Sequence, residues 1–496
     1  MQKDYVCMEA TQLSLFDFPK IEINKPIRLI ELFGGIGSQA MALRDIGADF
    51  EHYKLVEFDR YAVQSYNAIH GTQHITHDIR QIHATDLEIK DKDKYCYLMT
   101  YSFPCTDLSV AGKMQGMSKA DWENGNSTRS GLLWEVERIL KECKREELPQ
   151  ILLMENVPQV HAEQNKADFE SWLSFLRIKG YYNHWKDLNA KDYGIPQNRD
   201  RCFCVSILAD EFVDYEFPAP MPLTTVMKDF LEETVEEKYY ITTEKANKLI
   251  SQLVESGAIS AQSSEKVKVK VIGQMDNTLD NTLESANRVY DKGALYPTIP
   301  TCCGGGHQPK IIDKICVAMR GRNPEKPIFD TQNGVIEFLN PEKDGTCRTI
   351  KTQYFKNSIA NFIRQDSLGA TGVVEIKQAT KEGSIKCKVG GCYDASYPDS
   401  KTRRGRVQNG GDVTPTITAQ GGENINYIET QYRIRKLTPK ECWRLMGYTD
   451  EDFEKAKGAG VSNSQLYKQA GNAIVKQVLM AIFAQMIPSA GQTIAA

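Results

Sequence analysis

Short apolar segments alternate with amphipathic helical segments through the first two hundred residues, and this alternation is the feature that most restricts the fold. Strand-like segments are predicted at the start of 27–47, in 97–109 and in 149–160. Helices are predicted over 130–142 and 162–179. Strands that alternate with helices favour an α/β fold with a largely parallel sheet, and such sheets bind ligands at the carboxyl ends of their strands.

A glycine-rich turn follows the first predicted strand. In FGGIGSQA, Gly35 and Gly37 permit a tight turn and close approach of the backbone to a ligand, and the next helix offers free amide hydrogens. Glu57 stands 20 residues after Gly37, at the end of the second predicted strand, where a carboxylate binds ribose hydroxyls. A nicotinamide or flavin enzyme fits this pattern equally well. Asp78 ends the next short segment, within reach of an adenine.

Cys105 lies at the end of the apolar segment YLMTYSFPCTDLS, residues 97–109. Pro104 has no amide hydrogen, so the strand is expected to stop there and to present the thiol at the edge of the sheet. The alternative is a small buried apolar residue, since free cysteine is often buried. Residues 106–131 after it, rich in glycine and polar residues, are expected to form a lid or binding loop.

Two further groups of polar residues are expected at the same edge. Glu155 ends an apolar strand just before Pro158, and partial burial would raise its pKa enough to hold a proton near neutral pH. Gln197, Arg199 and Arg201 alternate along an extended segment, so the two guanidinium groups are expected on one face. Paired arginines beside an acid and a thiol can clamp an anion or a carbonyl.

Together these motifs resemble those of the DNA (cytosine-5) methyltransferases. SFPCTDLS, MENVPQ and QNRDR follow FGGIGS in the family order, and KLTPKECWRLMGY and QAGNAIVKQV resemble the last two family motifs. The resemblance covers roughly 27–208 and 433–487. One departure is Phe103, where many members have proline; we expect it to affect packing and not chemistry. The resemblance implies a Rossmann-like S-adenosylmethionine-dependent methyltransferase sheet with a smaller, mostly β or irregular target-recognition domain.

The resemblance also implies roles for the catalytic residues. Cys105 would attack carbon 6 of a flipped-out cytosine, Glu155 would act on ring N3, and Arg201 would bind O2. Arg199 would support the cysteine and the loop. The residues expected around S-adenosylmethionine are Phe33, Gly35, Ile36, Gly37, Ser38, Glu57, Phe58, Asp78, Ile79, Pro104, Asn472 and Ala473.

The chain is expected to divide into four parts. Residues 1–26 form an N-terminal arm, and residues 27–210 form a catalytic and cofactor-binding domain. Residues 211–432 form a target-recognition domain, and residues 433–496 form a segment that returns to the catalytic domain. Double-stranded DNA is the expected substrate, and the basic run KTRRGR at 401–406 is a candidate phosphate contact. The expected DNA-binding residues are Gln197, Ser109, Thr416, Ile417, Arg403 and Arg404.

The target-recognition region repeats itself. Residues 287–305 and 405–423 share Arg-Val, a glycine and Pro-Thr-Ile, and a shorter copy stands at 345–352. The family carries a Thr-aliphatic pair in this domain, so Thr298-Ile299, Thr349-Ile350 and Thr416-Ile417 resemble copies of it. They are either several recognition elements, as in some phage enzymes, or structural hairpins. We favour hairpins.

Composition narrows the remaining possibilities. A net charge of -4 does not by itself indicate nucleic-acid binding, and no apolar run reaches the ~20 residues of a membrane helix. The N-terminus lacks a signal-peptide core, so a cytoplasmic monomer is expected. Thirteen scattered cysteines without a CxxC pair indicate neither a metal site nor a disulfide framework. QLSLF at Gln12–Phe16 resembles a sliding-clamp-binding peptide, although we favour packing on the catalytic domain.

Three rival functions stay open at this point. An RNA cytosine-5 methyltransferase of the same fold shares these motifs, and the long insert argues for duplex DNA instead. A nicotinamide-dependent oxidoreductase would use the glycine turn but has no use for Cys105 and Glu155 together with the arginine pair. An inactive DNA-binding module is disfavoured because every chemical position is present. An amino-group methyltransferase is excluded, since its Asp/Asn-Pro-Pro-aromatic motif does not occur.

Overall fold

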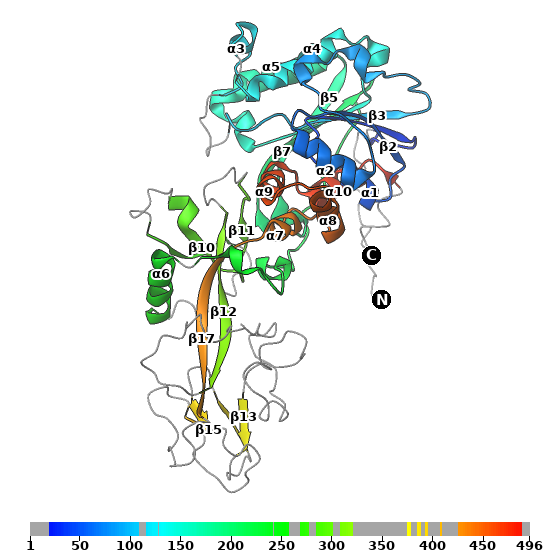
Figure 1. Ribbon diagram of the computed structural model, residues 1–496. Coiled ribbons are helices and arrows are strands. Elements are labelled where there is room, and N and C mark those ends of the chain that lie inside the picture. Colours follow the sequence, from blue (N-terminus) through cyan, green and yellow to red (C-terminus); the bar gives the residue numbers. More distant parts are fainter. Residues whose placement is uncertain are drawn as a thin grey trace, which may run out of the picture.

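The computed structural model has two sheets joined through a group of C-terminal helices (Figure 1). The residues that it describes are 19–108, 116–126, 128–241, 243–256, 268–276, 284–300, 308–320, 374–377, 384–387, 392–394, 407–408 and 425–488. Within these residues, no helix is long and apolar enough to span a membrane.

The first sheet has six strands in the order β2-β1-β3-β4-β7-β5. Its strands are β1 (Ile27–Leu32), β2 (Phe50–Val56), β3 (Cys96–Tyr101), β4 (Ile151–Asn156), β5 (Tyr181–Asn189) and β7 (Asp200–Leu208). The first four are parallel, whereas β7 runs antiparallel to both β4 and β5. The sequence predicted the parallel strands. The reversed β7 matters for the site, because it places the start of β7 beside the end of β4.

Helices cover both faces of this sheet (Figure 1). One buried core joins the sheet to α4 (Leu133–Glu142) and α5 (Lys166–Ile178). The other joins it to α1 (Ser38–Asp45) and to the C-terminal helix α10 (Lys476–Ala484). All six residues of β3 and of β4 are buried, as expected of central strands covered on both faces. This arrangement confirms the Rossmann-like α/β sheet.

The C-terminal segment returns to the start of the chain. It forms α7 (Pro439–Arg444), α8 (Asp450–Gly458), α9 (Asn463–Asn472) and α10, and α2 (Arg60–His70) packs against α8. Thr438, Thr449 and Ser462 each cap a helix with a side-chain oxygen, which explains where α7, α8 and α9 begin. Helix α10 packs on α1, which lies more than 400 residues earlier in the chain.

The second sheet forms the smaller lobe. Its path is β16-β15-β17-β12-β10-β9, with β8 beside β17. The bounds are β8 (Tyr240–Ile241), β9 (Val271–Gln274), β10 (Arg288–Tyr290), β12 (Lys310–Arg320), β15 (Cys392–Asp394), β16 (Val407–Gln408) and β17 (Ile425–Lys436). The long β12–β17 ribbon extends away from the first sheet, and α6 (Glu244–Glu255) packs near its base (Figure 1). Two short pairs, β6 (Gln197–Asn198) with β11 (Tyr296–Pro297) and β13 (Val374–Lys377) with β14 (Ser384–Cys387), lie outside these sheets.

The loop expected over 106–131 is partly helical. Residues Lys119–Glu123 form the short helix α3, with Ser118 as its N-cap. The sequence reasoning was wrong in treating the whole stretch as irregular. A five-residue helix is too short to produce a clear hydrophobic period, so its signal was lost among the surrounding glycines and polar residues.

Glu31 lies fully buried beneath the glycine turn. The hydroxyl of Tyr66 donates to its Oε2 at 2.6 Å, and burial raises the pKa of Glu31 to about 8. The folded protein therefore binds this proton more tightly than the unfolded chain does. The stability contributed by Glu31 is present below pH ~4.5 and is lost as the pH rises through about 8.

Replacing Glu31 with glutamine should remove this pH dependence. The amide keeps an acceptor for Tyr66 without a titratable proton. Between pH 5 and pH 8, the free energy of unfolding of the variant should therefore rise relative to that of the native protein by on the order of 3–5 kcal/mol. Urea unfolding of both proteins across that pH range measures the difference in their free energies of unfolding. The titration of nearby histidines affects both proteins alike and cancels in this difference. Equal pH slopes for both proteins would contradict the assignment.

Candidate functional site

The carboxyl edge of the first sheet gathers three of the predicted reactive side chains. Cys105 follows the end of β3, Glu155 is the last residue but one of β4, and Arg201 is the second residue of β7. The Arg201 Nε lies 3.1 Å from Glu155 Oε1. A thiol, a carboxyl group and a guanidinium thus lie at the ends of three neighbouring strands, where the sequence predicted all three.

The thiol of Cys105 is half-buried. Burial raises its pKa, and the neighbouring carboxylate of Glu155 acts in the same direction. Arg201 and Arg199 oppose this rise, because their positive charges favour the thiolate. Cys105 is therefore a protected thiol that becomes more acidic whenever Glu155 is protonated.

Glu155 is almost completely buried. Burial raises the pKa of Glu155, although Arg201 and Arg199 lower it in part. The direction agrees with the sequence-based expectation of a carboxyl that holds a proton near neutral pH. Asn156, next in β4, donates from its amide to the carbonyl of Phe103 at 2.9 Å, which ties the end of β4 to the turn that carries Cys105.

Arg199 does not share the position of Arg201. It lies between β6 and β7, and its Nη2 donates to the carbonyls of Gly471 at 3.0 Å and Ala473 at 2.7 Å. Its Nη1 donates to Ile299 O at 3.5 Å. The two arginines differ in their bonded partners, although both positive charges act on Cys105 and Glu155. Any support that Arg199 gives to Cys105 acts at a distance, while its bonds join the C-terminal segment to 296–299.

Removing this buried guanidinium should destabilise the fold. Arg199→Met leaves the carbonyls of Gly471 and Ala473 without a donor, and we expect the free energy of unfolding to fall by about 2–4 kcal/mol. Denaturant unfolding measures the change. The matched control is Arg177→Met, an exposed arginine on α5, which should change stability by less than about 1 kcal/mol. A similar small effect at Arg199 would contradict its structural role.

Gln197 is not available to DNA in this structure. Its side chain is fully buried, its Nε2 donates to Leu445 O at 2.7 Å, and its Oε1 accepts from Ile299 N at 3.3 Å. The prediction that Gln197 binds DNA is therefore contradicted by its burial and by its bonds to Leu445, Met446 and Ile299. Thr298 also contacts this segment, since its hydroxyl donates to Asn198 O at 2.7 Å.

The glycine turn after β1 has the strained backbone of a ligand-binding turn. Phe33 has a φ of 58°, which is rare for a residue with a side chain, and Gly35 and Gly37 also have positive φ. A Cβ built at Gly35 meets nothing within 4 Å, so this residue faces open space. Glu57 accepts from the amide of Gly35 at 2.9 Å and from Asp59 N at 2.7 Å. Burial raises the pKa of Glu57.

The other predicted cofactor residues divide into accessible and inaccessible groups. Phe58 has an exposed fraction of 73%, which is high for a phenylalanine, and Asn472 is also exposed. Ile36, Ser38, Ile79 and Ala473 have buried side chains. The hydroxyl of Ser38 lies 2.7 Å from that of Tyr448 and accepts from Ile474 N at 3.4 Å, and its role in cofactor binding stays a prediction. Pro104 is half-buried beside Cys105.

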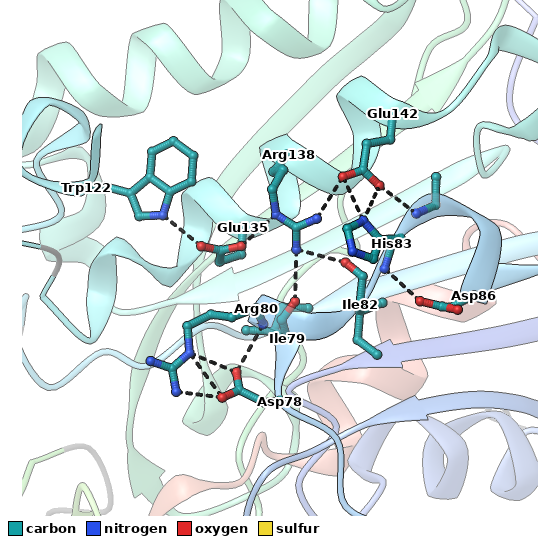
Figure 2. A network of polar contacts seen from close by, with 11 residues as sticks. Asp78, Ile79, Arg80, Ile82, His83, Asp86, Trp122, Glu135, Arg138 and Glu142 are labelled. Atoms are coloured by element: carbon teal, nitrogen blue, oxygen red, sulfur yellow. Dashed lines mark hydrogen bonds and ion pairs between the residues drawn. The ribbon is translucent and has the colours of Figure 1, made fainter. Parts of the chain in front are cut away.

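A polar network connects residues 78–82, where Asp78 and Ile79 were predicted to contact adenine, to the loop that follows Cys105 (Figure 2). Arg138 of α4 donates to the carbonyls of Ile79 at 3.1 Å and Ile82 at 2.8 Å. Its Nε also donates to Glu135, which accepts from the indole of Trp122 on α3. The carboxylate of Asp78 binds Arg80. The sequence reasoning missed Arg138, because a polar residue on an amphipathic helix carries no signal of its own.

Several predicted residues lie outside the described part of the chain. This applies to Ser109, Arg403, Arg404, Thr416, Ile417, the Thr349-Ile350 pair and Gln12–Phe16. Of the three Thr-aliphatic pairs, Thr298-Ile299 lies within the described residues, where it packs beside Gln197 and Arg199. The predicted roles of the others stay predictions.

Comparison with known proteins gives a consistent family. The model of the C-5 cytosine-specific DNA methylases matches residues 27–488. The chain is 27% identical over 518 residues to the orphan methyltransferase M.SPBetaI of Bacillus phage SPbeta, covering 93% of this chain and 97% of that protein. It is also 27% identical over 511 residues to the type II methyltransferase M2.ScrFI of Lactococcus lactis subsp. cremoris, covering 93% and 99%. Among solved structures, S. pombe Dnmt2 methyltransferase aligns with a TM-score of 0.48 at 15% identity, covering 93% of this chain and 98% of that one.

Proposed function

Because the chain belongs to the C-5 cytosine-specific DNA methylase family, we propose that it transfers a methyl group from S-adenosylmethionine to carbon 5 of a cytosine in double-stranded DNA. The observation that carries this proposal is the convergence of Cys105, Glu155 and Arg201 at one edge of the sheet. The target lies within a specific DNA sequence, as expected of a restriction-modification or phage methylase.

The glycine turn and its neighbours fit a nucleoside with a charged sulfonium. Gly35 faces open space, and Glu57 is held beside it, where its carboxylate can accept from ribose hydroxyls. The exposed ring of Phe58 and the ring of Phe33 are available for an adenine. When bound, S-adenosylmethionine supplies an electrophilic methyl group. Asn472 and Pro104 would close the pocket from the C-terminal and catalytic sides.

The chemistry assigns one step to each side chain. Carbon 5 of cytosine is a weak nucleophile, so Cys105, after its proton has passed to solvent, adds as a thiolate to carbon 6 and turns the ring into an enamine. Glu155 holds a proton at ring N3, where charge would otherwise build, and Arg201 donates to O2. After the methyl group has moved, loss of the carbon 5 proton to a base or water expels the thiolate of Cys105.

Attack on carbon 6 requires the base to leave the stacked duplex. Flipping the base out of the duplex costs a few kcal/mol. Protein contacts with the flipped base, and with the position that it leaves in the base stack, must offset this cost. The loop over 106–131 begins beside Cys105 and can hold the base in the site. Lys119 at the start of α3 forms an ion pair with Glu137 of α4 at 2.8 Å, so this part of the loop is anchored to the catalytic sheet.

The second sheet and its loops are the proposed source of DNA recognition. Residues 27–210 are assigned to catalysis and cofactor binding, and residues 211–432 to target recognition. Residues 433–496 complete the first domain, and residues 1–26 form an N-terminal arm. Lysines and arginines of the recognition region would contact phosphates, and loop residues would contact base edges. The protein is proposed to act as a monomer. Residues Gln12–Phe16 are a candidate contact with a replication sliding clamp.

A mechanism-based trap tests the proposal. A DNA duplex with 5-fluorocytosine in place of cytosine cannot lose a proton from carbon 5, so the enzyme should remain covalently attached when the methyl donor is present. We expect a denaturation-resistant adduct with DNA that is absent with Cys105→Ala. No adduct on any duplex, together with methylation of transfer RNA, would instead identify an RNA methyltransferase of the same fold. Bisulfite sequencing of DNA from expressing cells would then give the target sequence.

Glu57 provides a test of the cofactor site alone. Glu57→Ala removes the acceptor for the ribose hydroxyls and the partner of the Gly35 amide, so the dissociation constant for S-adenosylmethionine should rise about 10–100-fold. Calorimetric titration without DNA measures it. The control is Glu51→Ala, a more exposed acid on β2, the strand that ends just before Glu57. An unchanged dissociation constant in Glu57→Ala would refute the ribose assignment.

A further inference from the structure

A thiol, an imidazole and a carboxylate lie close together on the strands β7 and β5 and the segment after β4, whereas the glycine turn follows β1 near the other end of the sheet. Within the described residues, the ligand atoms of His161, Asp187 and Cys202 all lie within 4.8 Å of one another. His161 Nε2 is 3.1 Å from one carboxylate oxygen of Asp187 and 3.0 Å from the other. The methyl-transfer chemistry gives no task to any of these three residues.

The fold explains why the three side chains meet. Asp187 of β5 and Cys202 of β7 are direct partners in the antiparallel ladder, so their side chains lie on one face of the sheet. His161 ends η5, the short 3-10 helix Pro158–His161 that follows β4, and crosses the same face. Three segments that are remote in sequence therefore each supply one potential ligand.

The histidine is held in position by aromatic side chains. Its ring centroid lies 4.8 Å from that of Trp185 and 6.2 Å from that of Phe169. Phe169 and Trp185 also pack edge to face. This packing limits the orientations of the His161 ring and keeps its Nε2 directed at Asp187.

We propose that His161, Asp187 and Cys202 form a binding site for a borderline-soft divalent cation such as Zn²⁺. Thiolate, imidazole and carboxylate are the ligands that Zn²⁺ prefers, and three protein ligands leave a fourth position for water. Tetrahedral Zn²⁺ places its ligand atoms about 3.3–3.6 Å apart, so closure from the present geometry needs shifts on the order of 1 Å.

Access and proton balance are compatible with this assignment. Cys202 is fully buried, whereas the side chains of His161 and Asp187 are 26% and 38% exposed, so an ion can enter from the solvent side. The thiol of Cys202 gives up its proton to solvent when the Cys202–metal bond forms, and neutral His161 changes tautomer. One proton is thus released for each ion bound.

The ion would act as a clamp on the catalytic edge. Cys202 directly follows Arg201, and η5 follows the strand that carries Glu155. A bound cation would tie η5 to β5 and β7 and so restrict the segments on either side of the Glu155–Arg201 pair. This assignment differs from the sequence-based expectation of no metal, which relied on cysteine spacing and could not detect a site with a single cysteine.

Cobalt binding to the full-length protein tests the site directly. Co²⁺ replaces Zn²⁺ and gives a thiolate-to-metal charge-transfer band in the near ultraviolet. In the native chain, under a non-thiol reductant, we expect this band to saturate at one equivalent and Zn²⁺ to displace it. Cys202→Ala should lose the band. Asp187→Asn, a nearly isosteric change at a partly exposed position, should weaken cobalt binding at least tenfold.

Matched controls separate the site from other cysteines and histidines. Cys204→Ala removes a buried thiol two residues further along the same face, and His184→Ala removes an imidazole of β5 that bonds to Val213 O. Both should bind cobalt within about twofold of the native protein. Binding that persists in Asp187→Asn, a band that persists in Cys202→Ala, or no binding at one equivalent would overturn the proposal and leave a hydrogen-bonded cluster only.

Discussion

Replacing Cys105 with alanine should abolish methyl transfer while the affinity for S-adenosylmethionine stays unchanged. Without a covalent bond at carbon 6, the cytosine ring does not become an enamine, and its carbon 5 cannot attack the methyl group. Loss of a covalent nucleophile costs on the order of 10⁴-fold or more in turnover. Transfer of a labelled methyl group to duplex DNA under single-turnover conditions measures this loss.

The position of Cys105 makes the variant a clean test. The side chain is half-buried at the end of β3, and alanine removes only its sulfur, so the glycine turn and Glu57 should keep their geometry. Cys143→Ala at the end of α4 serves as the control, because that thiol is also buried but lies away from the site, and it should retain activity. Retention of methyl transfer in Cys105→Ala would refute the nucleophile assignment.

Glu155→Gln should lower turnover by about 10²–10⁴-fold with little effect on cofactor affinity. Glutamine can still donate a hydrogen bond to ring N3, but it cannot transfer a proton there as charge develops. It also leaves Arg201 without its charged partner at 3.1 Å. Single-turnover methylation of a duplex measures the rate, and the exposed Glu170→Gln on α5 is the control.

The pH dependence of the same variant gives a second readout. Because burial raises the pKa of Glu155, the protonated form persists to a higher pH than for an exposed glutamate. As the pH rises through this raised pKa, Glu155 loses its proton and the native rate should fall. Glu155→Gln carries no such proton, so its low rate should lack this decline. A decline of the same shape in both proteins would show that another group controls it.

The sequence by itself was sufficient for the elements that depend on local pattern. The parallel strands β1, β3 and β4 appear as apolar segments that stop shortly before Gly35, Pro104 and Pro158, and Cys105 and Glu155 stand at or just after the ends of β3 and β4. Since the carboxyl ends of parallel strands share one edge, Cys105 and Glu155 could be placed together before any coordinates were known.

What depends on long-range pairing could not be read from the pattern. Arg199 and Arg201 alternate in sequence, yet one binds Gly471 and Ala473 while the other binds Glu155. Alternation does not fix the bonded partners of a side chain, and Arg199 lies between β6 and β7, outside the strand that carries Arg201. Gln197 has the composition of a DNA-contacting residue, but the helices that follow residue 436 bury it.

Local sequence pattern therefore determined which residues are candidates for the site, and tertiary structure decided which of them lie together. Strand ends, glycine turns and helix caps follow from the preferences of a few neighbouring residues, so they can be predicted from short stretches of sequence. The reversed direction of β7, the return of α10 to α1 and the meeting of His161, Asp187 and Cys202 each join segments far apart in sequence. Such contacts are selected by burial across the whole fold, for which a short stretch of sequence carries no signal.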